Sequence, residues 1–162
     1  MDEYLVISYH GRMHGTDEEC DLLGYERMFA REIPCWVHVW NLMGKWYIGQ
    51  NQGKYEVSLQ WLRTFKRLLW INCNSLQASD MLMSVDDFRY IPWSETKLMH
   101  STCAYDVRLT NKGDMIVGCK VEDWNSNSII FLPEHSKIKD LYQVRGVITS
   151  WVTECLTMRC KQ

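Results

Sequence analysis

The sequence predicts an α+β fold, in which a mostly antiparallel sheet carries one long amphipathic helix and one or two shorter helices packed on it. Three observations predict this fold. Short runs of alternating apolar and polar residues mark strands, turns containing Gly or Asn separate them, and one stretch near the middle has helical spacing. The 162 residues contain no internal repeat and no Pro/Gly/Ser-rich linker, so we expect a single globular domain over residues 1–162.

The composition is that of a globular protein with many large apolar side chains. Hydrophobic residues make up 46% and charged residues 23% of the chain, and the formal net charge is −2. This charge argues against a surface that binds nucleic-acid phosphates over its whole extent, although it allows a local basic patch. The sequence also holds 8 Trp, 9 Met and 7 Cys, which suits a protein with large aromatic anchors.

The start of the chain and the cysteines indicate a soluble, intracellular protein. The opening "MDEYLVISYHG" is acidic where a signal peptide is basic, and no apolar run reaches the ~18 residues that span a bilayer. The cysteines are odd in number and form no C-x-x-C pair: Cys20, Cys35, Cys73, Cys103, Cys119, Cys155 and Cys160. We therefore expect reduced, buried thiols rather than a disulfide framework.

The first elements expected along the chain are a strand and a helix. The stretch "YLVISYHGRMH" at residues 4–14 alternates with a period of two at Leu5, Ile7 and Tyr9, as in a half-buried strand. Residues 21–32 carry apolar residues at helical spacing behind an acidic start, and Pro34 prevents the helix from continuing.

The stretch "CWVHVWNLMGKWYIG" at residues 35–49 predicts a hairpin. Trp36, His38 and Trp40 share one face of its first strand and two valines share the other, while Trp46 lies in the second strand. Either the tryptophans or the valines must pack in the core. We expect partial burial with an interface edge, since aromatic residues are enriched at the centres of interfaces. A nucleotide-stacking platform is least favoured, because the stretch contains a single cation.

Residues 56–70 predict the long amphipathic helix. Arg63, Lys66 and Arg67 form a basic stripe on it that could meet phosphates or an acidic membrane, although a solvated helix face is the commoner case. The segment "SLQWL" at residues 58–62 is similar to the Ser-Leu-Gln element with which some retroviral accessory proteins recruit a ubiquitin-ligase adaptor. This similarity implies an alternative function, an accessory adaptor that captures a host protein through the 56–70 helix.

The second half of the chain predicts one short helix followed by strands. Residues 78–88 are ambiguous and fit a short helix capped by Ser79 or Asp80. The later elements are a hairpin over 104–122 around Asn-Lys-Gly, a strand over 127–132 ended by Pro133, and one or two closing strands over 141–158, with a terminal helix from about Thr149 as the alternative.

Few residues indicate a metal-binding or catalytic site. His10, His14 and Cys20 are the candidate metal ligands, but the two histidines fall at a strand end and in a turn, so their spacing matches no closed zinc site. Other reactive residues close in sequence are Cys35 with His38, His100 with Cys103, Asp86 with Asp87, and Glu122 with Asp123. No nucleophile elbow, phosphate loop or dinucleotide fingerprint is present. We therefore predict no enzyme and no cofactor, and a metal- or thiol-dependent enzyme is the third alternative.

Three segments of the first half follow one another in a recognisable order: "YLVISYHGRMHG", "LLGYERMFARE" and "WYIGQNQGKYEVSLQWLRTFKRLL". An early strand ending in a Gly-Arg type turn, a helix, and then a long apolar helix on an antiparallel sheet resemble the matrix proteins of rhabdovirus-like negative-strand RNA viruses. The chain departs from them in lacking a Lys-rich N-terminal arm, a proline-rich late motif and a basic net charge. The resemblance implies a non-enzymatic protein that self-associates and bridges a nucleocapsid to an envelope.

Together these features predict a virus-encoded, matrix-like interaction protein. We expect it to bind itself as a homo-oligomer, to bind viral or host proteins, and to make at most weak contact with RNA or an acidic membrane. No small-molecule substrate is expected. The expected location is the host cytoplasm or nucleus, with the virion as a further place.

Overall fold

The computed structural model describes residues 4–15, 18–85, 87–94, 106–122, 124–132 and 143–159. In this part of the chain four helices surround a ten-stranded sheet. In chain order the elements are β1 (Leu5–Tyr9), α1 (Leu22–Ala30), β2 (Cys35–Leu42), β3 (Lys45–Ile48), β4 (Tyr55–Val57), α2 (Leu59–Phe65), β5 (Leu69–Cys73), α3 (Leu76–Ser84), β6 (Tyr90–Ile91), β7 (Val107–Leu109), β8 (Met115–Gly118), β9 (Ser128–Leu132), β10 (Gly146–Thr149) and α5 (Val152–Arg159).

The sheet is mixed, and the prediction of a mostly antiparallel sheet is wrong. Strands β6, β5, β2, β1, β10, β9 and β8 are neighbours in that order, and every pair among these neighbours is parallel. Only β2–β3, β3–β4 and β7–β8 are antiparallel within the described residues. Connections that contain α1 or α2 return the chain to the same end of the sheet, and this makes the flanking strands parallel.

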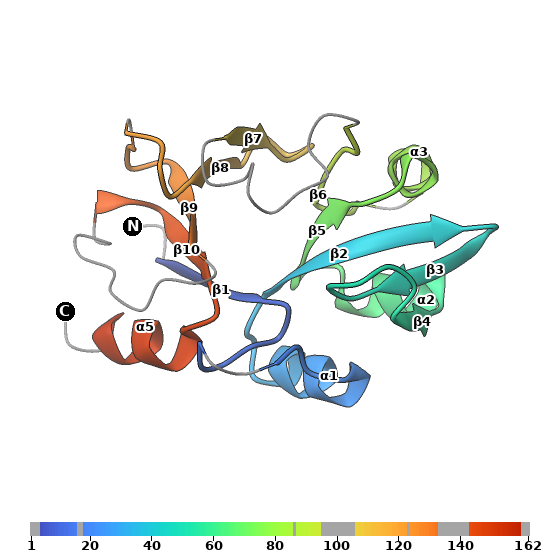
Figure 1. The fold of residues 1–162 in the computed structure, drawn as a ribbon, viewed down its shortest axis with the longest axis horizontal. Coiled ribbons are helices and arrows are strands. Elements are labelled where there is room, and N and C mark those ends of the chain that lie inside the picture. The colour runs from blue at the N-terminus through green and yellow to red at the C-terminus, as the bar shows by residue number, and fades with distance from the viewer. Residues whose placement is uncertain are drawn as a thin grey trace.

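Among the described residues the sheet curls into a ring that is closed by hydrogen bonds from Asn111, not by a strand pair. Figure 1 shows the strands arranged around a common centre, with α1, α2, α3 and α5 outside them. Asn111, in the turn after β7, donates from its main-chain N–H to the carbonyl of Tyr90 in β6 at 2.9 Å. Its side-chain oxygen accepts from the Tyr90 N–H at 2.8 Å, and its side-chain nitrogen donates to the carbonyl of Phe88 at 2.8 Å. Asn111 therefore supplies the hydrogen bonds that a further strand would give to β6.

Two hydrophobic clusters cover the two faces of the sheet. The cluster inside the ring takes at least one side chain from each of the seven parallel strands. Its members are Ile7, Tyr9, Trp36, Trp70, Ile91, Ile116, Ile129, Phe131 and Ile148. The other cluster lies between the sheet and the helices, and it includes Val37 and Val39 of β2 together with Tyr25 and Phe29 of α1. Because both faces are covered, strands such as β2 and β5 are buried along almost their whole length.

The hairpin predicted at residues 35–49 is confirmed as β2 and β3. Their two-residue turn, Met43–Gly44, has positive φ at both positions (52° and 84°), as a type I′ turn requires. On the same edge of β2, the first residues pair with β1 and the last pair with β3. β3 and β4 therefore extend from the end of β2 as a branch outside the ring of parallel strands.

The prediction of one long helix over residues 56–70 is wrong. α2 begins after Ser58, whose hydroxyl accepts from the Trp61 N–H at 2.9 Å, and it ends at Phe65. The next apolar run forms β5, which pairs with β2 from Leu69 to Cys73. A continuous apolar run fits a buried helix and a buried parallel strand equally well, so local spacing alone misassigned it.

The remaining elements agree with the predictions in most places. The β7–β8 hairpin, the strand β9 and the helix α1 are confirmed, and α5 confirms the terminal helix that was the alternative near Thr149. The short helix α3 begins earlier than predicted, because Ser75, not Ser79 or Asp80, caps it. No helix in the described part of the chain has the length and apolar character that crossing a membrane requires.

The ring closure at Asn111 gives a testable prediction. Asn111→Ala removes the side-chain hydrogen bonds to the backbone of Tyr90 in β6 and of Phe88 just before it. We expect it to lower the free energy of unfolding by about 2 kcal/mol. Urea denaturation followed by tryptophan fluorescence measures this change. Asn127→Ala, at an exposed loop position, is the control. If the two variants lose the same small amount of stability, the closure does not depend on the Asn111 side chain.

Candidate anion-binding site

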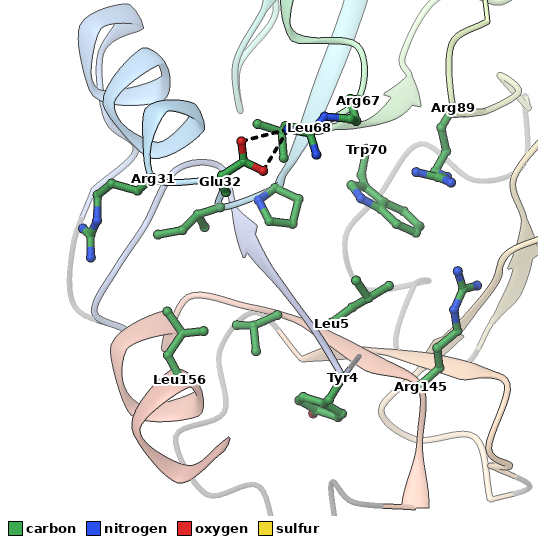
Figure 2. A pocket seen from close by; sticks show the side chains of 13 residues that line it. Tyr4, Leu5, Arg31, Glu32, Arg67, Leu68, Trp70, Arg89, Arg145 and Leu156 are labelled. Carbon is green, nitrogen blue, oxygen red and sulfur yellow. Dashed lines mark hydrogen bonds and ion pairs between the residues drawn. The ribbon is translucent and has the colours of Figure 1, made fainter. Parts of the chain in front are cut away.

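A cavity of about 540 Å³ lies at the amino-terminal ends of the parallel strands. Its lining includes Leu5 at the start of β1 and residues just before three other strands: Pro34 before β2, Arg89 before β6 and Arg145 before β10. Figure 2 shows these side chains around it. This volume is in the range of about 300–1,000 Å³ that is typical of small-molecule sites.

The cavity is strongly basic. Four arginines line it, Arg31, Arg67, Arg89 and Arg145, and Glu32 is the acidic residue of the lining. The carboxylate of Asp114 contacts two of these arginines from behind. Among the described residues the lining contains no histidine, cysteine or serine, and its charged groups are the four arginines and Glu32.

Asp114, at the start of β8, holds two of the arginines in place. Its Oδ2 accepts from Nε of Arg89 at 2.8 Å, and its Oδ1 accepts from Nη1 of Arg145 at 2.7 Å. Oδ2 also accepts from the hydroxyl of Thr110 at 2.7 Å. Burial raises the pKa of Asp114, but the hydrogen bonds from Thr110 and Arg145 and the positive charge of Arg89 outweigh it and lower the pKa below its ordinary value. The carboxylate is therefore ionised at neutral pH.

The backbones of these two arginines are fixed as well. The Arg145 N–H donates to the carbonyl of Ser128 and its carbonyl accepts from the Leu5 N–H, so the residue is tied to both β9 and β1. The carbonyl of Arg89 accepts from the Ile71 N–H of β5. Its guanidinium carbon also lies 4.4 Å from the centre of the Trp70 ring, a cation–π contact. Both guanidinium groups are thus preorganised by the ring.

The other side of the cavity carries a looser ion pair. Arg67, after α2, donates from Nη2 to both oxygens of Glu32 at 2.9 and 2.8 Å. The two side chains are 71% and 67% exposed, so this pair contributes only about 0–1 kcal/mol and can open readily. Glu32 itself has φ of 60°, which places its carboxylate at the cavity after the end of α1.

Of the basic stripe predicted on residues 56–70, only Arg67 lines the cavity; Arg63 and Lys66 do not. Sequence reasoning missed Arg31, Arg89 and Arg145. One local signal was available, since Arg89 and Arg145 each stand directly before a buried apolar strand. Nothing local shows that these strand starts lie together.

The four hairpin residues proposed for an interface are buried, and the partial exposure expected for them is not found. The exposed fractions are 2% for Trp36, 6% for His38, 6% for Trp40 and 5% for Trp46. The sequence posed a choice between tryptophans and valines in the core. Because the sheet curls, the ring interior takes Trp36 while the helices cover the valines, so both faces are core.

The three candidate metal ligands do not come together as a site. Nδ1 of His10 lies 3.4 Å from the buried carboxylate of Glu19, and Nδ1 of His14 lies 3.6 Å from Glu154 at the surface. Burial and the charge of Glu19 raise the pKa of Cys20 to about 12, so its thiol is protonated at neutral pH. The described residues hold no group of three His, Cys, Asp or Glu side chains that could bind a metal ion.

The other reactive pairs give no site in the described part of the chain. Cys35 and His38 belong to opposite faces of β2. The residues His100, Cys103, Asp86 and Asp123 lie outside the described residues.

The carboxyl-terminal end of the strands carries a polar layer, and the cavity described there is small. The rings of His10 and His38 meet edge to face, with centroids 4.5 Å apart, and Nη1 of Arg108 donates to Oδ1 of Asn72 at 3.4 Å. The cavity beside Arg108 and Trp36 is only about 10 Å³, which is at most enough for one water molecule. The amino-terminal cavity is therefore the stronger candidate for binding a ligand.

Comparisons of the chain with protein-family models, with curated proteins and with solved structures give no match. Function is therefore inferred from the cavity itself. Its defining feature is a pair of guanidinium groups held by one buried carboxylate beside an open space.

The dependence on Asp114 is testable. Asp114→Asn leaves Arg89 and Arg145 without their carboxylate, and we expect a loss of about 2–4 kcal/mol in the free energy of unfolding at pH 7. Because folding lowers the pKa of Asp114, its contribution is present above its ordinary pKa and disappears as the pH falls through the lower, folded value. The difference between wild type and variant should therefore shrink below about pH 4.

Urea denaturation at pH 7 and at pH 3 measures this effect, with the exposed Asp80→Asn as control. Equal losses for the two variants at pH 7 would show that Asp114 does not anchor the site.

Proposed function

We propose that this protein is an interaction protein that recognises an anionic group of its partner in the arginine-lined cavity. The observation that carries the proposal is the placement of Arg89 and Arg145 on the two oxygens of Asp114. Figure 2 shows their guanidinium groups facing one another at one side of the cavity. Guanidinium groups bind phosphate and carboxylate through paired, charge-assisted hydrogen bonds.

The local charge balance supports an anion as the ligand. The four lining arginines contribute four positive charges, against one negative charge each from Glu32 and Asp114. Two positive charges therefore remain, although the whole chain has a net charge of −2. Because Asp114 uses only Nε of Arg89 and Nη1 of Arg145, other N–H groups of both side chains are not engaged by it. A fixed site of this kind loses little side-chain entropy on binding.

Anion binding gives the first test of this function. Inorganic phosphate should bind the wild-type protein in isothermal titration calorimetry, more weakly as NaCl is raised, since salt screens charge–charge attraction. Arg145→Gln should weaken binding at least tenfold, whereas Arg63→Gln, outside the cavity, should have no effect. Circular dichroism checks that both variants are folded.

Glu32→Gln is an independent variant that should strengthen phosphate binding, whereas Arg145→Gln should weaken it. It removes the carboxylate that competes for Arg67, and we expect phosphate to bind about threefold more tightly, as the strength of an exposed ion pair implies. If phosphate binds neither the wild-type protein nor Glu32→Gln, the proposed function is wrong.

A matrix-like role, in which copies of the chain associate and bridge a nucleocapsid or another partner, is the second candidate. One observation favours self-association. Leu76 and Met83 lie seven residues apart on α3 and are 54% and 72% exposed. Residues seven apart share a helix face, and Met is enriched at the centres of interfaces. That the protein is encoded by a virus, and that its partner is a nucleocapsid, are parts of this second proposal.

Sedimentation velocity across a concentration series tests self-association. We expect oligomers of the wild-type protein to grow with concentration, and Leu76→Ser with Met83→Ser to shift the protein toward monomer because they remove the shared apolar face. Leu23→Ser, at an exposed position of α1, is the matched control. A wild-type protein that stays monomeric at high concentration would exclude this role.

A further inference from the structure

We infer that the anion bound in the arginine-lined cavity is a phosphate monoester, a terminal phosphate attached to an organic group. This inference rests on the proposed function, because it specifies the ligand of the same site. In the inferred complex the phosphate lies between Arg89 and Arg145, and the organic group extends over the apolar part of the cavity.

The size of the cavity supports a ligand larger than a bare anion. A water molecule occupies about 30 Å³ of liquid, so one inorganic phosphate would leave most of the space to solvent. Besides the charged side chains of Arg31, Glu32 and Arg67, the rest of the lining has an apolar part that includes Leu5, Pro34 and Leu156. Figure 2 shows Leu5 between Trp70 and Arg145, and Leu156 farther along the cavity. An organic group attached to the phosphate would cover this surface and exclude water from it.

The charge favours a monoester over other anions. A phosphate monoester carries about −1.5 to −2 at pH 7. Its charge matches the two positive charges that remain around the whole cavity, one from Arg89 and Arg145 with Asp114 and one from Arg31 at the far end of the lining. A phosphodiester or a carboxylate carries only one negative charge. A monoester also presents three terminal oxygens, and these can accept from two separate guanidinium groups at once.

The residues around the arginines restrict where the phosphate can bind. Trp70 is only 3% exposed and its ring lies under the guanidinium of Arg89, so it positions that group rather than stacking on a ligand. On the other side of the cavity, the carboxylate of Glu32 already occupies Arg67 and repels a second anion. The pair formed by Arg89 and Arg145 is therefore the stronger place for the single anionic end of the ligand.

A monoester can reach the cavity from two sources, a free small molecule or a phosphorylated side chain of a partner protein. Both present the same terminal phosphate on an organic group. A short peptide containing phosphotyrosine distinguishes them from a free ester such as phenyl phosphate.

Isothermal titration calorimetry at pH 7.5 with a series of probes tests the inference. Phenyl phosphate should bind at least tenfold more tightly than inorganic phosphate, than methyl phenyl phosphate, which is a diester, and than benzoate. Glycerol 2-phosphate, a monoester with a polar organic group, should fall between phenyl phosphate and inorganic phosphate. These comparisons use the wild-type protein and so do not depend on the folding of any variant.

Three variants on α5 locate the organic group. Leu156→Ser should weaken the binding of phenyl phosphate about tenfold and the binding of inorganic phosphate much less, because only the ester reaches this side chain. Met158→Ser lies on the same helix but outside the cavity lining, and it should change neither affinity. Leu156→Met should restore the preference for phenyl phosphate.

The outcomes separate this inference from the proposed function. Phosphate binding that Arg145→Gln removes, without a preference for phenyl phosphate, would keep the proposed function and overturn the inference. Absence of binding by every probe would overturn both. Binding of the phosphotyrosine peptide at least as tight as that of phenyl phosphate supports a partner-borne monoester, and exclusion of the peptide supports a small molecule.

Discussion

The buried carboxylate of Asp114 is the interaction on which the ring and its cavity depend. It joins the turn between β7 and β8, through Thr110, to the chain before β6 and before β10, through Arg89 and Arg145. An isolated buried carboxylate would destabilise the fold, and three hydrogen bonds offset that cost here. The same bonds present two guanidinium groups at the cavity. The same contacts therefore stabilise the fold and position the groups that would bind an anion. A bound anion would add to the stability of the ring.

The second constraint is that both faces of the seven parallel strands are covered. The inner side of the sheet encloses aromatic and branched side chains from these strands, and its outer side is covered by helices. This arrangement accounts for a sequence rich in tryptophan that nevertheless leaves Trp36, Trp40 and Trp46 almost completely buried. Polar side chains collect instead at the two ends of the strands. Among the described residues, the amino-terminal end combines them with a cavity large enough for a ligand.

The sequence predicted those parts of the fold whose signals are local. The β2–β3 and β7–β8 hairpins carry their own turn residues, and Pro34 limits α1. The parallel order of the strands could not be predicted, because β1 pairs with β10 from the far end of the chain and no local pattern records that contact. For the same reason only Arg67 of the four cavity arginines was recognised. The others come together only after the ring has closed.

The pairing of β2 gives the molecule a modular branch. Along one edge β2 pairs first with β1, which turns away through His10 and Gly11 in left-handed conformations, and only then with β3. The β3–β4 branch thus occupies backbone that the ring does not use. Its length is not fixed by the circumference of the ring, and its tip at Met43 is 98% exposed. Evolution or design can therefore lengthen, shorten or replace this projection while the strands that shape the cavity keep their neighbours.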